Sequence, residues 1–206
     1  MKNTRFSNYR QLLRFKKPIL NPKQRRLSRA HTIYDLREIA QRVTPQGPFD
    51  YTDGAADQEI SLNRARRAFE DIEFHPHILR NVDKASLATT LLGKPVNLPV
   101  GIAPTGFTRM MNSAGERASS SVAQELGIPF ALSTMGTTSI ENVAKAAPHG
   151  SNWFQLYLWR DREKSMELIS RAHSAGFDGL ILTVDAQIAG ARLRDVRNGL
   201  TVPPSL

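Results

Sequence analysis

From about residue 97 the sequence repeats one pattern, in which an apolar run is followed by an amphipathic helical segment. The runs LPVGIAP, PFALST, NWFQLYLW and GLILTVD begin near residues 98, 129, 152 and 179, at intervals of about 23 to 31 residues. Strands that alternate with helices at this spacing predict successive βα units and a parallel sheet. Because the runs are apolar almost throughout, we expect both faces of the sheet to be buried.

Helix-start signals accompany the pattern. SAGE at 113–116 and TSIE at 138–141 have the spacing of a capping box and predict the starts of the first two helices of the repeat, while Asp161 can cap the third. A further capping box, formed by Thr32 and Asp35, predicts a helix over about 33–43.

Residues 31–96 lack the βα repeat. Besides the helix over about 33–43, apolar positions at helical spacing predict a second helix over about 58–72, and FDYTDGAADQ lies between the two. FHPHIL and TTLLGKPVNLPV are expected to be short extended pieces, with GKP as a turn in the second. This region is therefore interpreted as a helical cap with a short hairpin.

Three βα units and a fourth strand fit either an open doubly wound sheet or the first half of a barrel. A dinucleotide-binding sheet carries GxGxxG after its first strand, whereas this sequence has GIAPTGFTRM there. The difference favours a (β/α)8 TIM barrel, which needs eight units and typically about 250 residues. We expect an α/β fold in which residues 97–206 form the first four strands of a TIM barrel, truncated to about its first half, behind an N-terminal helical cap.

Charge changes the interpretation mainly at the N-terminus. A net charge of +9 over 206 residues usually suggests a nucleic-acid or anionic membrane partner. Residues 1–30, however, hold ten of the 28 Lys and Arg and none of the 19 Asp and Glu, so the other 176 residues carry 18 minus 19, or −1. The sequence thus has a basic tail rather than a basic domain, and no nucleic-acid partner is expected. The tail is either a solvated extension or a segment that lies on an anionic membrane surface.

The chain contains no Cys, which excludes disulfides, thiolate nucleophiles and Cys-ligated metal centres. We predict no metal site. No segment approaches the roughly 18 uninterrupted apolar residues of a membrane span, and the N-terminus lacks the apolar core of a secretory signal. The expected location is cytoplasmic, with the inner face of the cell membrane as an alternative.

In α/β barrels the chemistry lies at the carboxyl ends of the strands. The predicted strands end in small or polar residues: Pro104, Thr105, Gly106, Ser133, Gln155, Tyr157, Thr183 and Asp185. The spacing of two in the last two strands puts each pair of side chains on one face. In the loop beyond, the guanidinium of Arg192 can bind a carboxylate through two hydrogen bonds. Each of these residues also has a structural interpretation, as a turn, a cap or a surface arginine.

The ordered motifs YTDGAADQ, FHPHIL, GIAPTG, LST, WFQLY, LTVD and GARLRDVRNG resemble the FMN-dependent L-2-hydroxy-acid oxidising family, which includes L-lactate dehydrogenases and glycolate oxidases. The resemblance covers about residues 20–206 and is strongest to the actinobacterial type of respiratory L-lactate dehydrogenase. It implies FMN as cofactor and oxidation of an L-2-hydroxy acid, with L-lactate converted to pyruvate. It also implies quinone or oxygen as electron acceptor and a homo-oligomer for complete members.

The resemblance implies roles for the matching positions. Residues 104–106 correspond to the backbone stretch along the flavin, and the residues that bond its ring system are Ser133, Gln155 and Thr183. Tyr51 and Tyr157 resemble the two active-site tyrosines, Arg192 the loop residue that meets the substrate carboxylate, and Asp185 the carboxylate that pairs with the catalytic histidine.

The family pattern continues with a lysine beside the flavin, a histidine base, an arginine for the substrate carboxylate and a glycine-rich phosphate site, and none of these motifs is present in the 206 residues. We therefore expect an N-terminal portion that is inactive by itself. The alternatives are a non-catalytic truncated gene product and a half-barrel that binds a partner. An FMN barrel acting on nonacidic substrates is disfavoured by Arg192, Tyr51 and Tyr157.

Overall fold

The computed structural model describes residues 18–185, 188 and 190–200. These residues belong to two compact units, which cover residues 1–45 and 46–206. Among the described helices, none is long and apolar enough to cross a lipid bilayer. The second unit contains every residue that the sequence assigns to a site.

The described part of the first unit consists of two helices. Helix α2 spans Pro22–Leu27 and begins where the Asn21 side chain accepts two backbone hydrogen bonds. Helix α3 spans Ile33–Val43, the bounds that the apolar pattern predicts, and it starts with the predicted capping box. The pattern does not predict α2, and residues 1–17 of the predicted basic tail lie outside the described residues.

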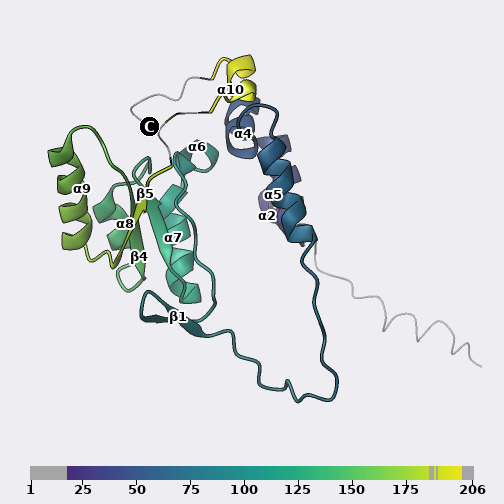
Figure 1. Cartoon of the computed structure of the whole chain (residues 1–206). Coiled ribbons are helices and arrows are strands. Elements are labelled where there is room, and N and C mark those ends of the chain that lie inside the picture. The colour runs from purple at the N-terminus through teal and green to yellow at the C-terminus, as the bar shows by residue number, and fades with distance from the viewer. Residues whose placement is uncertain (1–17, 186–187, 189, 201–206) are drawn as a thin grey trace, which may run out of the picture. The chain divides into compact units, whose positions relative to one another are not determined.

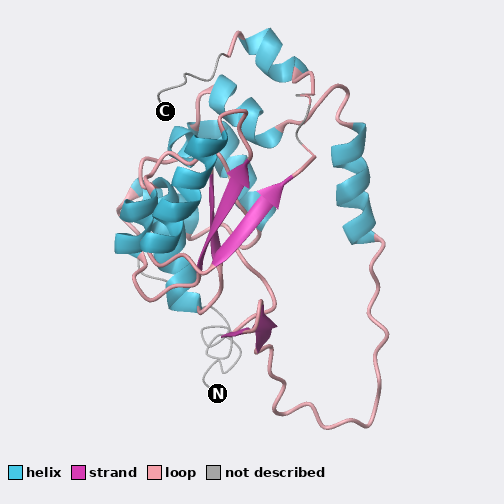
Figure 2. Cartoon of the chain, turned by 60° about the vertical axis from the view of Figure 1, so that its left-hand side comes forward, coloured by secondary structure: helices cyan, strands magenta, loops and turns pink. Residues whose placement is uncertain are grey.

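A three-stranded parallel sheet in the order β3-β4-β5 runs through the second unit (Figure 2). The strands are β3 (Phe130–Ser133), β4 (Asn152–Tyr157) and β5 (Gly179–Thr183). Ser133 pairs with Gln155, and Tyr157 pairs with Thr183. Three of the four predicted strands are therefore confirmed, with the predicted parallel direction, and their carboxyl ends lie at one edge of the sheet.

The first predicted strand, near residue 98, does not form in the structure. Only Ile102 forms a parallel bridge, to Phe130, through two backbone hydrogen bonds of 2.8 and 2.9 Å. Pro99 and Pro104 flank this residue, and because proline has no N–H group neither can donate to a β-ladder. Pairing is thus limited to one residue, and the described residues form an open sheet.

Helices cover the sheet between successive strands (Figure 1). They are α7 (Gly115–Leu126) before β3, α8 (Ile140–Ala146) between β3 and β4, and α9 (Arg162–Ser174) between β4 and β5. Their apolar sides and the strands form one core, which includes Ile128, Phe130, Leu132, Ile140, Val143, Phe154, Leu156 and Phe177.

The expectation that both sheet faces are buried is correct for β3 but wrong for β5. All four residues of β3 are buried, whereas Leu180 and Leu182 of β5 are 50% and 48% exposed. β3 pairs with β4 and also bridges to Ile102, whereas β5 pairs with β4 alone among the described residues, and its Leu180 and Leu182 stay half-exposed.

The second unit also contains a hairpin and further helices. The predicted hairpin consists of β1 (Thr89–Leu91) and β2 (Lys94–Val96), which pair antiparallel around Gly93 at a φ of 76°. The helices are α4 (Gln46–Asp53), α5 (Ile60–Glu70), α6 (Thr108–Met111) and α10 (Leu193–Asn198). Helix α5 confirms the helix predicted over about 58–72, α4 was not predicted, and FHPHIL forms no strand.

Two predicted capping boxes are wrong. Helix α7 has Ala114 as its N-cap with no side-chain cap, and Glu116 instead turns toward the loop after β3. Helix α8 is capped by Ser139 rather than by Thr138. The predicted cap at Asp161 is confirmed, since its carboxylate accepts a hydrogen bond from the Lys164 N–H at 3.2 Å.

Candidate functional site

A row of polar side chains crosses the carboxyl ends of the three strands. The Ser133 hydroxyl donates to Gln155 Oε1 at 3.2 Å, and Gln155 Nε2 donates to Thr183 Oγ1 at 2.7 Å. Ser133 and Gln155 are buried, with exposed fractions of 6% and 2%. The parallel register produces this arrangement, because it aligns the strand ends.

This row fits the polar edge of a flavin ring. A hydroxyl group both donates and accepts, and an amide offers donors on one side and an acceptor on the other, so the three groups can pair with ring nitrogens and carbonyl oxygens in a plane. The Thr134 N–H also points at Gln155 Oε1, at 3.1 Å. The donor set is therefore of the kind that a nitrogen-rich heterocycle needs.

The loop of residues 104–106 lies next to the row. The Phe107 N–H donates to the Met135 carbonyl at 3.0 Å, which holds the loop against the segment that follows β3. A Cβ atom at Gly106 would lie 3.0 Å from Met135 Cβ, so close backbone packing requires a residue without a large side chain. A cavity of about 230 Å³ opens beside this loop. Within the loop Pro104 is half-buried and Thr105 is exposed.

Tyr51 comes to the site from α4. Its ring is half-buried and packs edge-on against Phe107, with ring centroids 6.0 Å apart. Burial raises the pKa of the Tyr51 hydroxyl, against the opposing effect of the Arg192 positive charge, and the neighbouring Tyr157 raises it further. The hydroxyl is therefore protonated at neutral pH and can donate a hydrogen bond.

Arg192 lies over the Tyr51 ring, with its Cζ atom 4.8 Å from the ring centroid. Its Nε donates to Asp195 Oδ2 at 2.7 Å, while Nη2 donates to the carbonyl of Tyr51 and, at 3.3 Å, to that of Gly54. Among the described residues Nη1 has no hydrogen-bond partner. The structure thus brings Tyr51, Tyr157 and Arg192 into one neighbourhood.

Asp185 stands apart from this group. It follows β5, is exposed, and makes no hydrogen bond or ion pair with the described part of the chain. Tyr157, by contrast, is fixed at the end of β4, where its N–H donates to Thr134 Oγ1 at 3.0 Å.

Two groups of residues that support the site are not predicted by the sequence pattern. The first is Glu116, which is 1% exposed and accepts hydrogen bonds from the Thr137 N–H at 2.6 Å and the Thr138 hydroxyl at 2.7 Å. Burial alone would raise the pKa of Glu116, but these hydrogen bonds outweigh it and hold the pKa below its ordinary value. The carboxylate therefore stays ionised and fastens the loop after Ser133.

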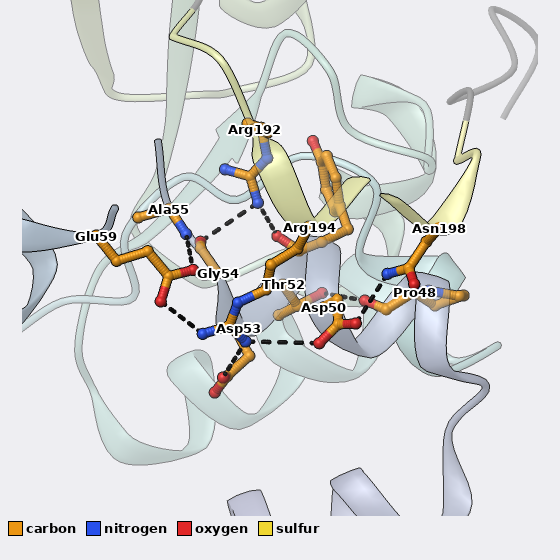
Figure 3. A network of polar contacts seen from close by, with 11 residues as sticks. Pro48, Asp50, Thr52, Asp53, Gly54, Ala55, Glu59, Arg192, Arg194 and Asn198 are labelled. Atoms are coloured by element: carbon orange, nitrogen blue, oxygen red, sulfur yellow. Dashed lines mark hydrogen bonds and ion pairs between the residues drawn. The ribbon is translucent and has the colours of Figure 1, made fainter. Parts of the chain in front are cut away.

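The second missed group surrounds Arg194 (Figure 3). Its guanidinium forms ion pairs with Asp53 at 3.1 Å, Asp50 at 3.5 Å and Glu59 at 2.5 Å. The hydrogen bond from Arg194 holds the pKa of Glu59 below its ordinary value. The opposite charges of the motifs DYTDGAADQE and RLRD were the only signal available in the sequence.

Comparisons with known proteins identify the family of the chain. The model of the family described as FMN-dependent dehydrogenase matches residues 40–206. A Mycobacterium tuberculosis (strain ATCC 25618 / H37Rv) protein named "Putative L-lactate dehydrogenase" is 54% identical over 195 residues, which are 95% of this chain and 47% of that protein. Human 2-Hydroxyacid oxidase 1 is 37% identical over 180 residues, covering 87% of this chain and 49% of that protein.

Among solved structures, a crystal structure of mandelate oxidase matches with a TM-score of 0.80 and 34% identity, over 85% of this chain and 52% of that one. This likeness confirms the expected α/β architecture, about the first half of a TIM barrel. The chain spans about half the length of the curated relatives it matches. From the match over residues 40–206 and these identities, the chain belongs to the FMN-dependent dehydrogenase family.

Proposed function

We propose that, within a complete FMN barrel, this chain forms the part of the active site that binds an L-2-hydroxy acid, with L-lactate as substrate and pyruvate as product. The observation that carries the proposal is the position of Arg192 over Tyr51, with one guanidinium nitrogen left for a carboxylate. Relatives named as L-lactate dehydrogenase and 2-hydroxyacid oxidase support it.

For the cofactor, the proposal assigns residues 104–106 to the backbone along the flavin. It assigns the hydrogen bonds to the ring system to Ser133, Gln155 and Thr183. When bound, FMN supplies the acceptor for the two electrons of the substrate oxidation. The residues of this chain orient the ring. The hydrogen bonds between Ser133, Gln155 and Thr183 already hold these side chains at the strand ends, so little side-chain ordering is needed when the ring binds.

For the substrate, we assign the carboxylate to Arg192 and the orienting hydrogen bonds to Tyr51 and Tyr157. A charge-assisted hydrogen bond fixes the carboxylate, and the phenol hydroxyls then orient the rest of the molecule. Asp185 is proposed to pair with a histidine base supplied by the other half of the barrel, where it would hold the imidazole in the useful tautomer. Its exposed position after β5 leaves the carboxylate available for such a partner.

The proposal extends to acceptor and location. Quinone or oxygen reoxidises the flavin, the complete barrel is a homo-oligomer, and the protein is cytoplasmic with its basic tail at the anionic inner face of the membrane. In the described part of the tail, Leu20 is 88% exposed, and α2 adds basic residues and the half-exposed Leu27. Binding to anionic vesicles, compared between the whole protein and one lacking residues 1–30, tests this contact. Equal binding refutes it.

The test of the function uses the holoprotein, meaning the FMN-loaded complete barrel that contains residues 1–206. It is made as one polypeptide or as a fusion to the part of the M. tuberculosis relative that this chain does not match. Under anaerobic conditions L-lactate should bleach its flavin absorbance, and D-lactate should not. The 206-residue polypeptide alone should retain little FMN. A complex that assembles but neither binds FMN nor is bleached would support the alternative, a non-catalytic half-barrel that binds a partner.

A further inference from the structure

The ion pairs between residues 50–59, the segment that carries Tyr51, and α10 are all made by the guanidinium of Arg194. Three carboxylates from this segment converge on Arg194, and Asn198 Nδ2 adds a hydrogen bond to Asp50 at 2.8 Å (Figure 3). We propose that Arg194 is a positioning residue that clamps residues 50–59 to α10 and thereby holds Tyr51 and Arg192 together in the substrate site.

The charge balance makes Arg194 essential to this contact. Asp50, Asp53 and Glu59 contribute three negative charges against one positive charge, and their side chains are shielded, with exposed fractions of 17%, 7% and 16%. Like charges at close range repel, and more strongly when water is partly excluded. Without Arg194 the three carboxylates would therefore repel one another within residues 50–59, and the segment would lose its ion pairs to α10.

The sequence positions couple the clamp to the site. Asp50 and Asp53 flank Tyr51 on the same helix, and Arg194 lies two residues after Arg192. The backbone continues the contact, because the Asp57 N–H donates to the Ala191 carbonyl at 2.7 Å. A change at Arg194 is thus transmitted directly to both substrate-binding side chains.

The conformation of residues 50–59 depends on such external contacts. Asp57 and Glu59 have φ values of 50° and 59°, in the left-handed region that residues with a Cβ atom adopt only at a cost. At Gly54 a Cβ would lie 2.7 Å from the Asp50 carbonyl and 3.0 Å from Arg194 Cδ, so the packing admits only glycine. Strained backbone of this kind persists where the surroundings hold it, and here they are Arg194 and α10.

The inference rests on the proposed function for its effect on catalysis. Arg192 and Tyr51 are assigned to binding the substrate both before and during the reaction, and loss of such binding raises KM more than it lowers kcat. In the holoprotein, Arg194→Met should therefore raise KM for L-lactate tenfold or more while kcat changes less than threefold. The dissociation constant of propionate, which has the carboxylate of lactate but no hydroxyl group to oxidise, should rise in parallel when followed by flavin absorbance.

A second readout follows the clamp independently of activity. Hydrogen–deuterium exchange at the Asp57 amide should accelerate in Arg194→Met, because its bond to Ala191 opens. Arg194→Lys should recover part of both effects. The matched control is Arg197→Met, since Arg197 lies on the same helix, is exposed and forms no ion pair with the described residues; it should leave KM and exchange within twofold of the unmodified holoprotein.

The outcomes separate the two proposals. Accelerated exchange in Arg194→Met together with no L-lactate bleaching of the unmodified holoprotein would refute the proposed function and leave the clamp intact. Unchanged exchange and KM in Arg194→Met would overturn the clamp. If Arg194→Met does not fold, Arg194→Lys, which keeps the charge but lacks the planar fork that meets several carboxylates at once, should show the same directions at smaller size. No change in that variant would also overturn the clamp.

Discussion

Replacing the buried Glu116 with glutamine should destabilise the protein, because the Glu116 carboxylate fastens the loop that follows Ser133. The carboxylate accepts short hydrogen bonds from the Thr137 N–H and the Thr138 hydroxyl and a longer one from the Thr137 hydroxyl. A hydrogen bond to a charged group contributes about 1.5 to 3 kcal/mol and one between neutral groups about 0.5 to 1.5 kcal/mol. From the two short bonds alone, Glu116→Gln should therefore lower the free energy of unfolding by at least about 2.5 kcal/mol. Glu116→Ala, which removes all of these bonds, should lower it by at least about 4.5 kcal/mol.

The assay is urea unfolding of the holoprotein, with Glu125→Gln as the matched control because Glu125 is an exposed residue of the same helix. The pKa of Glu116 is below its ordinary value of 4.5 in the folded protein. Its ionised form thus stabilises the fold fully above that value, and the contribution is lost as pH falls through the lowered pKa. The difference between the unmodified protein and Glu116→Gln should shrink in that acidic range. A loss no larger than that of the control at pH 7 would refute this account of Glu116.

Two further predictions concern the proposed contacts to substrate and cofactor. Arg192→Met in the holoprotein should raise KM for L-lactate roughly tenfold to a hundredfold, because a charge-assisted hydrogen bond of about 1.5 to 3 kcal/mol is lost; steady-state kinetics checks this, and an unchanged KM removes Arg192 from the site. Gln155→Leu should weaken FMN binding at least tenfold, since it interrupts the polar row between Ser133 and Thr183. FMN titration measures it, and equal affinity would contradict the proposed ring contacts.

The sequence predicts the sheet well because its signal is local. Apolar runs of β-forming residues gave β3, β4 and β5, and the pattern around Thr32 gave α3 with its correct bounds. It failed for α4, since Gly47 and Pro48 indicate a turn. Proline is nevertheless tolerated in the first turn of a helix, where its missing N–H has no intrahelical partner.

The supporting residues could not be predicted because their partners are distant in sequence. Glu116 has the spacing of a cap, yet its carboxylate bonds residues more than 20 positions away. Arg194 meets acids about 135 to 144 positions earlier in the chain. Residue type and spacing suggest the chemistry of such groups, whereas only the fold decides which partner they find. The strand-end row was easier, because parallel pairing necessarily brings strand ends together.

Anaerobic titration of the holoprotein with the two enantiomers of lactate decides whether a barrel that contains residues 1–206 oxidises an L-2-hydroxy acid. The account predicts stoichiometric bleaching of the flavin absorbance by L-lactate, with pyruvate formed in equal amount, and no bleaching by D-lactate. A flavin that stays oxidised with L-lactate, or that is bleached equally by both enantiomers, would contradict it.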